Sequence, residues 1–591
     1  MQRDTTSLTD GEFDVLVIGS GAFGAAAARD CVCRGLRTAL IERNDFGAGT
    51  SAECFRMVHG GIRYLQHADL RRVRASCQER STLLRIAPHL VSPLPIAIPT
   101  YGRGRRGRIF LGAGACAYDL LTFDRNRRIA DPQRQIRHTQ FLSREELLAQ
   151  FPHLAAPDLS GAVVFEDGQM YSPSRLVLAF VKAAAAAGAA ACNYVEALHF
   201  IWEGAAVRGV RASDRLSGEV FDIRAKLTLN AAGPWADELQ LDAAHFGKWQ
   251  RQPFSRDACF IVNRPPVSNY GLAIQGRSRD RDALFGRATR HLFAVPWRNQ
   301  TLFGVWHRLF SQPADAARVT GSEIENWIAE LNASYPALEL SADEVTYAHC
   351  GLVPFGDTAT ETELSFGKES RIVDHRAVHN VTGLVSLVGI RFTTACGDAA
   401  RAVDMLLRQS PVRSTQRDAL RPVRTASTAM QRLPGGDIDD FESFQSRALQ
   451  ARPANIGEPT LLNLTRNHGT EYQQVLQLAQ DGSAARTVPG TATLLAEIQH
   501  AVHTEMATRL EDVVLRRTEM AVNGHPGNVA LAVAAAEMAR LCDWSPQRVA
   551  NEIDRTQLAL SWHLARCDSS VPASGPGTGS MERSRLAALA M

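Results

Sequence analysis

Near the start of the chain, short apolar runs rich in β-branched side chains flank an alanine-rich segment. Residues 13–18 (FDVLVI) predict a buried parallel strand, and residues 37–41 (RTALI) predict a second one. The intervening segment 25–35 (AAAARDCVCRG) predicts a helix that ends at Gly35. A strand, a helix and a strand in this order predict an α/β fold built around a parallel sheet.

A glycine-rich turn connects the first predicted strand to the helix. Gly19, Gly21 and Gly24 follow the pattern G-x-G-x-x-G, which lets the backbone approach a pyrophosphate at a helix N-terminus. Glu42 ends the second strand, where a carboxylate can bind a ribose 2′-hydroxyl. This acid disfavours the 2′-phosphate of NADP, and the unit by itself leaves FAD and NAD open. Arg43 is a further expected cofactor contact.

The loop that follows favours FAD. Residues 43–65 contain many Gly, Ser and Thr residues directly after Glu42, as suits a cofactor that continues past its pyrophosphate. Thr50 and Ser51 are the expected contacts in this loop.

A second group of nucleotide-domain segments lies far downstream. An alanine-rich helix at 176–191 precedes a strand at 193–197, in which Val195 is expected to flank an adenine. Further strands lead to a turn at Gly233, with the first two expected to form a hairpin: 207–212, 220–223 and 226–230. A sheet assembled from such discontinuous segments is typical of two-domain FAD oxidoreductases.

Several motifs together identify a family resemblance that extends over about residues 12 to 545. They are DVLVIGSGAFGAAAARD (14–30), TS (50–51), HGGIRYL (59–65), ERSTLLRIAPHLV (79–91), NAAGPWAD (230–237), FAVPW (293–297), RFTT (391–394) and EDVVLRRT (511–518). The chain resembles FAD-dependent glycerol-3-phosphate dehydrogenases, within the D-amino-acid-oxidase-like flavoproteins. HGGIRYL and the RRT block are specific to this family, whereas G-x-G-x-x-G is not. The resemblance implies bound FAD and oxidation of a secondary alcohol by hydride transfer to flavin N5, with electrons passed to a quinone or to oxygen.

Two residues of HGGIRYL are candidates for the substrate side of the flavin. Arg63 follows two glycines that let the backbone pass close to a flavin ring, and its guanidinium can bind a phosphate or carboxylate. His59 is a candidate base for the alcohol. The alternatives are a structural role for Arg63, a loop-orienting role for His59 and a packing role for Tyr64.

The loop at 389–394 supplies the remaining candidates. Gly389 precedes Arg391, which stands where the family commonly has Lys, and a cation there would stabilise a reduced flavin ring. Thr393 and Thr394 are expected to bind cofactor and to cap the helix that they open, with N-capping alone as the alternative for Thr393.

The substrate half departs from the family pattern. Val353 stands where the family has the Arg of Gly-Val-Arg-Pro, and residues 304–307 (GVWH) replace Gly-Thr-Thr-Asp. These changes predict an altered substrate or a different way of holding phosphate. Substitute contacts could come from four residues, each of which is otherwise explained as packing or surface: Trp306, His307, Arg308 and His349.

Composition sets the remaining limits. The net charge is +3, which is too small to indicate nucleic-acid binding, and the eleven cysteines include no C-x-x-C pair. Neither a signal peptide nor an apolar run long enough to span a membrane is evident, so a cytoplasmic protein is expected. We find no metal-ligand spacing, and a homodimer is one expected assembly.

One segment indicates contact with a membrane surface. Residues 102–128 place an apolar, glycine-containing stretch between two groups of arginines, as suits an interfacial segment facing anionic lipid on the inner face of a membrane. A surface helix with solvated arginines is the alternative.

These observations predict an α/β fold: a Rossmann-type FAD-binding domain, an antiparallel β-rich substrate domain and an α-helical C-terminal domain. The expected division is an FAD-binding domain (12–100, 160–240 and 350–408), an interfacial insertion (101–159), a substrate domain (241–349), a linker (409–440), a helical domain (441–566) and a disordered tail (567–591).

Three functions remain open from the sequence. The first is an FAD-dependent dehydrogenase that acts on a glycerol-3-phosphate-like anionic polyol and passes electrons to a quinone or another acceptor. The second is an oxidase of an amine, amino acid or hydroxy acid that uses oxygen. The third is a non-catalytic flavoprotein, which the change at Val353 keeps open.

Overall fold

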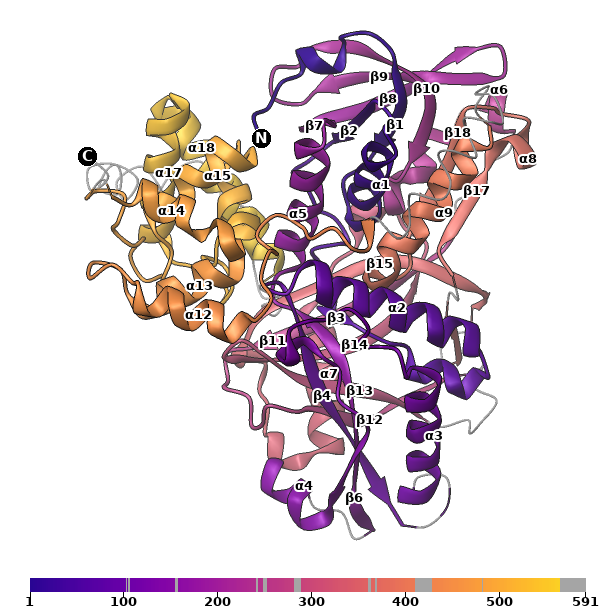
Figure 1. Cartoon of the computed structure of the whole chain (residues 1–591), viewed down its shortest axis with the longest axis vertical. Helices are drawn as coiled ribbons and strands as arrows, with labels where there is room; N and C mark the ends of the chain where they lie inside the picture. Colours follow the sequence, from indigo (N-terminus) through magenta and orange to yellow (C-terminus); the bar gives the residue numbers. More distant parts are fainter. Residues whose placement is uncertain are drawn as a thin grey trace.

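The computed structural model describes residues 1–102, 104, 107–154, 158–240, 243–247, 252–280, 289–359, 363–366, 369–409, 428–480 and 482–563. Two β-sheets and a group of C-terminal helices make up this part of the chain (Figure 1). The predicted fold class is confirmed: a Rossmann-type sheet with helices, a second sheet rich in antiparallel pairs, and a helical C-terminal region.

The first sheet contains the predicted βαβ unit. β1 (Phe13–Ile18) pairs in parallel with β2 (Thr38–Glu42), and α1 (Ala22–Cys33) connects them. β10 (Val220–Asn230) lies parallel to β1 on its other side. The other strands of this sheet are β7 (Ala190–Asn193), β8 (Val195–Glu203), β9 (Ala206–Asp214), β17 (Arg371–Asp374) and β18 (Leu384–Val388).

Alanine-rich helices pack closely on this sheet. α1 contacts α5 (Pro173–Ala186) and α9 (Ala395–Leu407), and all three contribute to one hydrophobic core with β1, β2 and β18. Alanine side chains allow such close packing and favour the helix. Because β1 and β10 are parallel, their carboxyl ends meet at one edge of the sheet, where the glycine-rich turn lies.

The second sheet has three antiparallel strands at its centre. β11 (Phe254–Val262) pairs with β14 (Gln300–Phe310) on one side and with β15 (Val345–Ala359) on the other. The other strands are β3 (Met57–Val58), β4 (Val91–Tyr101), β5 (Gln140–Ser143), β6 (Leu159–Met170), β12 (Gly271–Asp280), β13 (Thr289–Trp297) and β16 (Glu363–Phe366). Because β12 also pairs with β13, the sheet curls back on itself, and α7 (Gly321–Ser334) packs against it.

Two strands from segments that were predicted to belong to the FAD-binding domain lie in the second sheet instead of the first. β4 and β6 fall inside the segments predicted for the FAD-binding domain, yet they pair with each other in the second sheet. An apolar strand pattern does not specify which sheet a strand joins, because that depends on pairing between distant segments. The predicted hairpin strand at 220–223 and the strand at 226–230 are one strand, β10, whose first half pairs with β9 and whose second half pairs with β1.

The predicted linker is structured in its second half. Leu433 is buried, and its amide donates to the carbonyl of Ile86 at 2.8 Å. Residues 428–440 therefore pack against the rest of the chain despite their polar, glycine-rich composition. Ile438 is buried as well, and Arg29 donates to the carbonyl of Gln431 at 2.7 Å. Residues 410–427 and the predicted tail at 567–591 lie outside the described residues.

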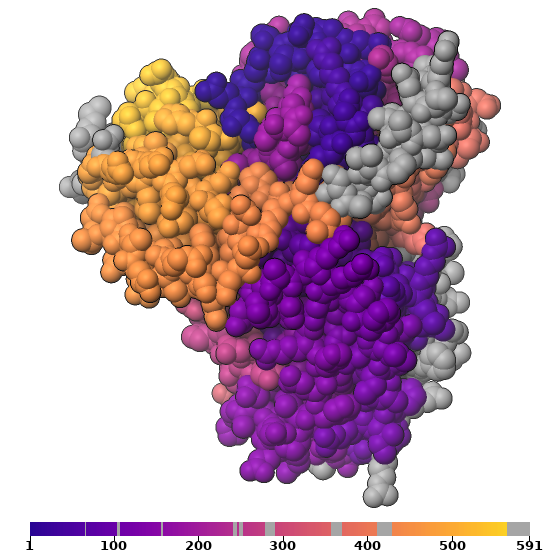
Figure 2. Space-filling view, in the orientation of Figure 1, coloured from indigo at the N-terminus to yellow at the C-terminus, as the bar shows by residue number. Residues whose placement is uncertain are grey.

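The C-terminal helices form their own hydrophobic cores (Figures 1 and 2). They pack beside the domain that contains the first sheet, which is called the first domain below. α18 begins at Pro546, and the hydroxyl of Ser545 just before it accepts from the amide of Arg548 at 3.3 Å. Among the described residues, no helix is both long and apolar enough to cross a membrane. The principal helices are α12 (Phe441–Gln450), α13 (Glu458–His468), α14 (Tyr472–Leu478), α15 (Leu495–Glu505), α16 (Leu510–Asp512), α17 (Asn528–Cys542) and α18 (Pro546–His563).

Ion pairs from the RRT block (511–518) connect these helices to the loop that follows Glu42. Asp45 is fully buried and accepts two bonds of 2.7 Å from Arg517 and one of 2.6 Å from Arg516. Arg516 also donates to Asp512 at 2.7 Å. Removing one member would leave a buried charge without compensation, which typically costs about 3–5 kcal/mol. The two arginines of this block thus have a structural role, because they hold the loop that follows Glu42.

Candidate active site

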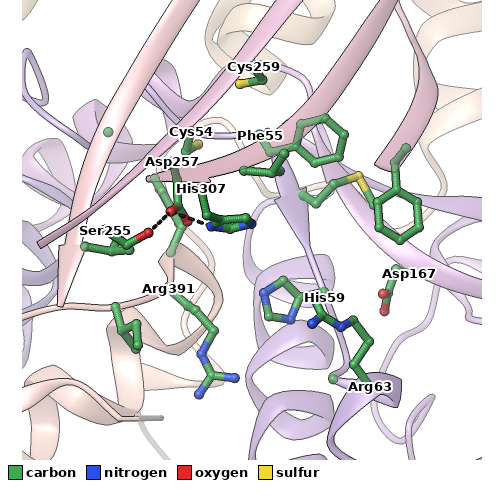
Figure 3. Close-up of a pocket in the computed structure, with 18 of the residues that line it drawn as sticks. Cys54, Phe55, His59, Arg63, Asp167, Ser255, Asp257, Cys259, His307 and Arg391 are labelled. Atoms are coloured by element: carbon green, nitrogen blue, oxygen red, sulfur yellow. Dashed lines mark hydrogen bonds and ion pairs between the residues drawn. The ribbon is translucent and has the colours of Figure 1, made fainter. Parts of the chain in front are cut away.

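A cavity of about 350 Å³ lies between the second sheet and the loops of the first domain (Figure 3). Its walls come from residues 50–67, the loop 389–392, and strands β11, β13, β14 and β15. The structure brings all three predicted catalytic residues, His59, Arg63 and Arg391, to this cavity. Segments more than 300 positions apart in the sequence therefore share one site.

A buried ion pair fixes the backbone of the HGGIRYL loop. Asp167 accepts from the amide of Gly60 at 2.6 Å and from Arg80 at 2.7 Å, and Arg80 is fully buried. A Cβ on Gly60 would lie 2.0 Å from the hydroxyl of Tyr118 and 2.5 Å from Arg80, so only glycine fits. Gly61 has φ = +78°, which glycine adopts without strain. The two glycines therefore serve packing and backbone conformation, and they aim the next residues into the cavity.

His59 lies among cationic neighbours. Its amide donates to the hydroxyl of Thr393 at 3.1 Å, which joins the HGGIRYL loop to the 389–394 loop. Burial, followed by the charges of Arg391 and Arg63, lowers the pKa of His59 to about 3. The imidazole is therefore neutral near pH 7, which is the form that can accept a proton.

Arg391 is oriented by side chains of the first domain. Its guanidinium donates to the hydroxyl of Tyr64 and, at 3.5 Å, to the hydroxyl of Ser76. Its charge also lies 4.8 Å from the centre of the Tyr64 ring. Tyr64 thus positions a cation at the cavity, a role that the packing interpretation of the sequence did not include.

The two threonines do not cap α9 with their hydroxyls. Thr394 occupies the N-cap position, but its hydroxyl donates to Asp398 at 2.8 Å and to the carbonyl of Arg391 at 3.2 Å. The hydroxyl of Thr393 accepts from His59 instead. The capping prediction is wrong because nearer carboxylate and amide groups compete for both hydroxyls.

The opposite wall carries a polar cluster on the second sheet. Asp257 on β11 and His307 on β14 are direct cross-strand partners, and His307 Nδ1 lies 2.6 Å from Asp257 Oδ1. The hydroxyl of Ser255 donates to the same oxygen at 2.6 Å. Burial, followed by the charge of Arg290, lowers the pKa of His307 to about 4. Ser255 and Asp257 were not singled out from the sequence, because they lie in a strand with no recognisable motif, and Arg290 stands outside the FAVPW motif of its strand.

Of the four candidate substitute contacts, only His307 lines the cavity. Trp306 stacks on Trp327 in the core, with ring centres 4.6 Å apart. The side chain of Arg308 is 72% exposed beside Glu323, and His349 is buried against the carbonyl of Cys54 at 3.0 Å. Val353 also lines the cavity, so the position of the missing family arginine faces the site.

The glycine-rich turn fits a dinucleotide. A Cβ on Gly24 would lie 1.9 Å from the carbonyl oxygen of Gly19, so the helix packs too closely on the turn for any side chain. The hydroxyl of Ser51 accepts from the amide of Ala22 at 2.9 Å at the start of α1. Both oxygens of Glu42 accept backbone amides, from Ser20 at 2.7 Å and from Asn44 at 2.9 Å. This anchoring holds the carboxylate at the end of β2, as ribose binding requires.

The other predicted cofactor residues occupy varied surroundings. Val195 is buried in a hydrophobic core that side chains of β1, β2 and β10 share, so its side chain packs in the protein interior. Arg43 lies over the ring of Trp235 and forms an ion pair of 3.1 Å with Asp315. The remaining three are Thr50 and Gly389, which line the cavity, and Gly233, which lies in the turn after β10.

A separate buried cluster joins α5 to the C-terminal helices. His468, His500 and Glu505 place ligand-type atoms within 4.8 Å of one another. Glu505, however, accepts from Arg175 at 2.6 Å and from Lys182 at 3.3 Å. These two cations supply the positive charge that a metal ion would otherwise bring, so the cluster is an ionic contact between domains.

Two family models match the chain. The model described as FAD dependent oxidoreductase matches residues 14–403, and the model described as the C-terminal domain of alpha-glycerophosphate oxidase matches residues 426–549. Together they cover both the two-sheet part and the helical part of the structure.

Relatives with known names match over nearly the whole chain. The glycerol-3-phosphate dehydrogenase of Synechocystis sp. is 28% identical over 566 residues, which are 94% of this chain and 97% of the relative. The mitochondrial glycerol-3-phosphate dehydrogenase of Homo sapiens is 28% identical over 581 residues, which are 94% of this chain and 74% of the relative. The crystal structure of the glycerol-3-phosphate dehydrogenase from Bacillus halodurans complexed with FAD has a TM-score of 0.70 and 23% identity, covering 96% of this chain and 98% of that chain. This last likeness establishes the fold.

Proposed function

Because the chain belongs to the family of FAD-dependent oxidoreductases, with FAD as its cofactor, we propose that it oxidises the secondary alcohol of a glycerol-3-phosphate-like anionic polyol. The observation that carries the proposal is the convergence of one neutral imidazole, His59, with Arg63 and Arg391 in a single cavity next to the cofactor-domain loops. The names of the curated relatives support the substrate class.

The glycine-rich turn, Glu42 and the loops at 50–51 and 389–394 are the groups proposed to hold FAD. Gly19, Gly21 and Gly24 would receive the pyrophosphate at the start of α1, and Glu42 would bind a ribose hydroxyl. Bound FAD supplies the hydride acceptor for the reaction. Gly389 lines the cavity where the protein would contact the flavin ring, and Thr393 is joined to that site through its bond with the amide of His59.

Three side chains of the cavity are proposed to bind the substrate and to accept its proton. Arg63 and Arg391 would bind the anionic group of the substrate, because guanidinium groups pair well with phosphate and carboxylate. His59 would accept the proton of the alcohol. Burial and then the charges of the nearby arginines keep His59 neutral before substrate binds, and a bound anion would offset those charges and raise the pKa of the imidazole.

Anaerobic reduction of the flavin tests the proposal. Bleaching of the purified holoprotein should be rapid with glycerol 3-phosphate and slow with glycerol, which lacks the anion. Bleaching by amino acids or hydroxy acids but not by polyol phosphates would contradict it and would favour the oxidase alternative, to which Val353 points because a phosphate-binding arginine is missing from that wall. An oxygen electrode would then identify the acceptor.

We also propose that the protein docks on a membrane surface through α3 (Arg108–Leu121), and that a quinone accepts the electrons there. α3 buries Gly112, Ala115 and Tyr118. It leaves exposed Ile109 (90%) and Leu120 (77%), and Phe123 (78%) follows directly. Exposed arginines at 108, 127 and 128 flank this apolar row. Apolar residues between cations suit the boundary of an anionic lipid bilayer.

Vesicle co-sedimentation tests the docking surface. Binding to vesicles that contain phosphatidylglycerol should fall at least about tenfold in the variant Ile109→Asp/Leu120→Asp, because two apolar side chains that would enter the bilayer become charged. Leu558→Asp, at a site 56% exposed on α18, is the matched control and should bind normally. Equal binding by all three proteins would remove α3 as the docking surface.

A further inference from the structure

A group of apolar side chains lines one part of the cavity, and it is called the apolar lobe below. Ile96 on β4 and Phe165 on β6 are direct cross-strand partners. Phe293 and Val295 are two positions apart on β13, so they point to the same face of the sheet. All members of the lobe line the cavity and share one hydrophobic cluster: Phe55, Met57, Ile96, Phe165, Phe293 and Val295.

A glycine on β14 makes room for Phe55 in this lobe. Gly304 is the cross-strand partner of Phe293, and a Cβ at Gly304 would lie 2.9 Å from the ring of Phe55. The ring centres of Phe55 and Phe293 are 6.4 Å apart. Both side chains are half-buried and line the cavity, so part of each ring is available to a bound molecule.

The apolar lobe shares its cavity with charged groups. Arg63 and Arg391 line the same cavity, and Figure 3 shows Phe55 above both of them in this view. Asp257 and Arg290 line it from the second sheet. A cavity with one charged part and one apolar part suits a molecule that has both an anionic group and a hydrocarbon group.

The lobe lies on the side of the cavity that is left for the substrate. The groups proposed to hold FAD belong to the first domain, whereas the strands that carry the lobe belong to the second sheet. Val353 adds one more apolar side chain to the cavity, at the position of the missing family arginine. Apolar side chains offer no hydrogen bond to the hydroxyl groups of a polyol, but burial of hydrocarbon against them favours binding.

We infer that the apolar lobe binds a hydrocarbon group that the substrate carries beside its oxidisable secondary alcohol. The inference rests on the proposed function and refines its substrate class. The preferred substrate is an amphiphilic anionic alcohol, with its anionic group at Arg63 and Arg391, its secondary alcohol near His59, and an alkyl or aryl group against Phe55 and Phe293.

The test compares glycerol 3-phosphate with 1-O-butylglycerol 3-phosphate, which keeps the phosphate and the secondary alcohol but carries a butyl ether in place of the free hydroxyl. In the wild-type holoenzyme, kcat/KM for anaerobic flavin reduction should be at least about tenfold higher for the butyl ether, because each buried methylene group favours binding by roughly threefold to fourfold. Phe55→Ala and Phe293→Ala should each lower this ratio by about threefold or more, through a higher KM for the butyl ether.

Phe141→Ala is the matched control, because Phe141 is 38% exposed and does not line the cavity, and this variant should keep the wild-type ratio. The absorbance of bound flavin at 450 nm should be normal in all three variants. The wild-type comparison needs no variant, so it decides the question even if a variant does not fold.

Three results would overturn the inference alone: a wild-type enzyme that does not prefer the butyl ether, lobe variants that keep the wild-type ratio, or lobe variants that fold but lose FAD. The last result would mean that the lobe holds the flavin ring. A wild-type enzyme that neither compound reduces would overturn the proposed function and this inference together.

Discussion

The two walls of the cavity are built in different ways. The loop wall, residues 59–64 and 389–394, depends on glycines that admit no side chain and on a buried ion pair between Arg80 and Asp167. The sheet wall consists of side chains that project from paired strands, so its backbone is held by the ladder of hydrogen bonds between β11, β14 and β15. Substitutions on the sheet wall can therefore change the chemistry while the backbone stays in place.

This difference explains where the chain departs from its family resemblance. On the loop wall the HGGIRYL motif is kept and Arg391 replaces the common Lys by another cation, whereas the sheet wall has Val353 and His307 in place of the residues that the family pattern predicts. A strand position tolerates exchange of one side chain, because neighbouring strands continue to fix its direction. A loop shaped by close backbone contacts does not tolerate exchange, since one added methyl group displaces several partners.

The strongest test of the comparison is Gly60→Ala. The added Cβ would displace Tyr118 and Arg80 and break the buried pair with Asp167, so we expect a loss of about 3–5 kcal/mol of stability. The melting temperature of the holoprotein should fall by roughly 3–6 °C. Gly114→Ala, where an added Cβ meets nothing within 4 Å, should melt as the wild type does. An unchanged melting temperature for Gly60→Ala would show that the loop is not held as described.

Arg63→Ala should abolish most of the activity without unfolding the protein. Loss of a charge-assisted partner for the substrate anion should lower kcat/KM for flavin reduction by roughly 100- to 1000-fold. Stopped-flow reduction at 450 nm measures this change. Arg71→Ala, an exposed arginine outside the cavity, is the control. Normal reduction by Arg63→Ala would assign Arg63 a structural role.

The pH dependence of kcat/KM tests whether His59 stays neutral beside the arginines of the loop wall. A base must be deprotonated to act, and the lowered pKa of His59 keeps it so down to about pH 3 in the free protein. We expect kcat/KM to show no acid limb near pH 6.5 apart from the one that the second ionisation of the phosphate substrate gives at about pH 6. In Arg391→Gln the acid limb due to His59 should move to higher pH, because the second-largest cause of its lowered pKa is removed. A further acid limb near pH 6.5 in the wild type would mean that a different group, or a His59 of ordinary pKa, accepts the proton.

Buried neutral histidines also predict an acid-labile fold. The pKa of His59 and that of His375 are both lowered to about 3 in the folded protein, mainly by burial. The unfolded chain binds protons below its ordinary pKa of about 6.5 while the folded protein does not, so stability falls as the pH drops from 6.5 toward 3. His375→Phe should reduce this dependence in chemical denaturation at pH 5 and pH 7. An identical dependence would show that His375 does not contribute.

The smallest effect is expected on the sheet wall. Val353→Arg places a guanidinium next to Ser255, where it can pair with Asp257 and draw the carboxylate from His307. We expect less than about a tenfold change in kcat/KM for glycerol 3-phosphate. Val378→Arg, at a site that is 63% exposed and does not line the cavity, is the control. A loss of folding in Val353→Arg would contradict the tolerance attributed to this wall.

The sequence by itself determined the local parts of the protein. The βαβ unit with Gly19, Gly21, Gly24 and Glu42 could be predicted because its strand, turn and helix are contiguous and each has a distinct pattern. His59, Arg63 and Arg391 could be named because they stand in recognisable motifs, and the structure brings them together.

Only the tertiary structure decided how distant strands combine. The membership of β4 and β6 in the second sheet and the pairing of Asp257 with His307 depend on long-range register, which a period-two apolar pattern does not encode. The same holds for the Arg516 and Arg517 contacts with Asp45, since a charged side chain in a sequence does not name its partner. The local patterns fix which elements form, and packing of the whole chain fixes which side chains meet in the cavity.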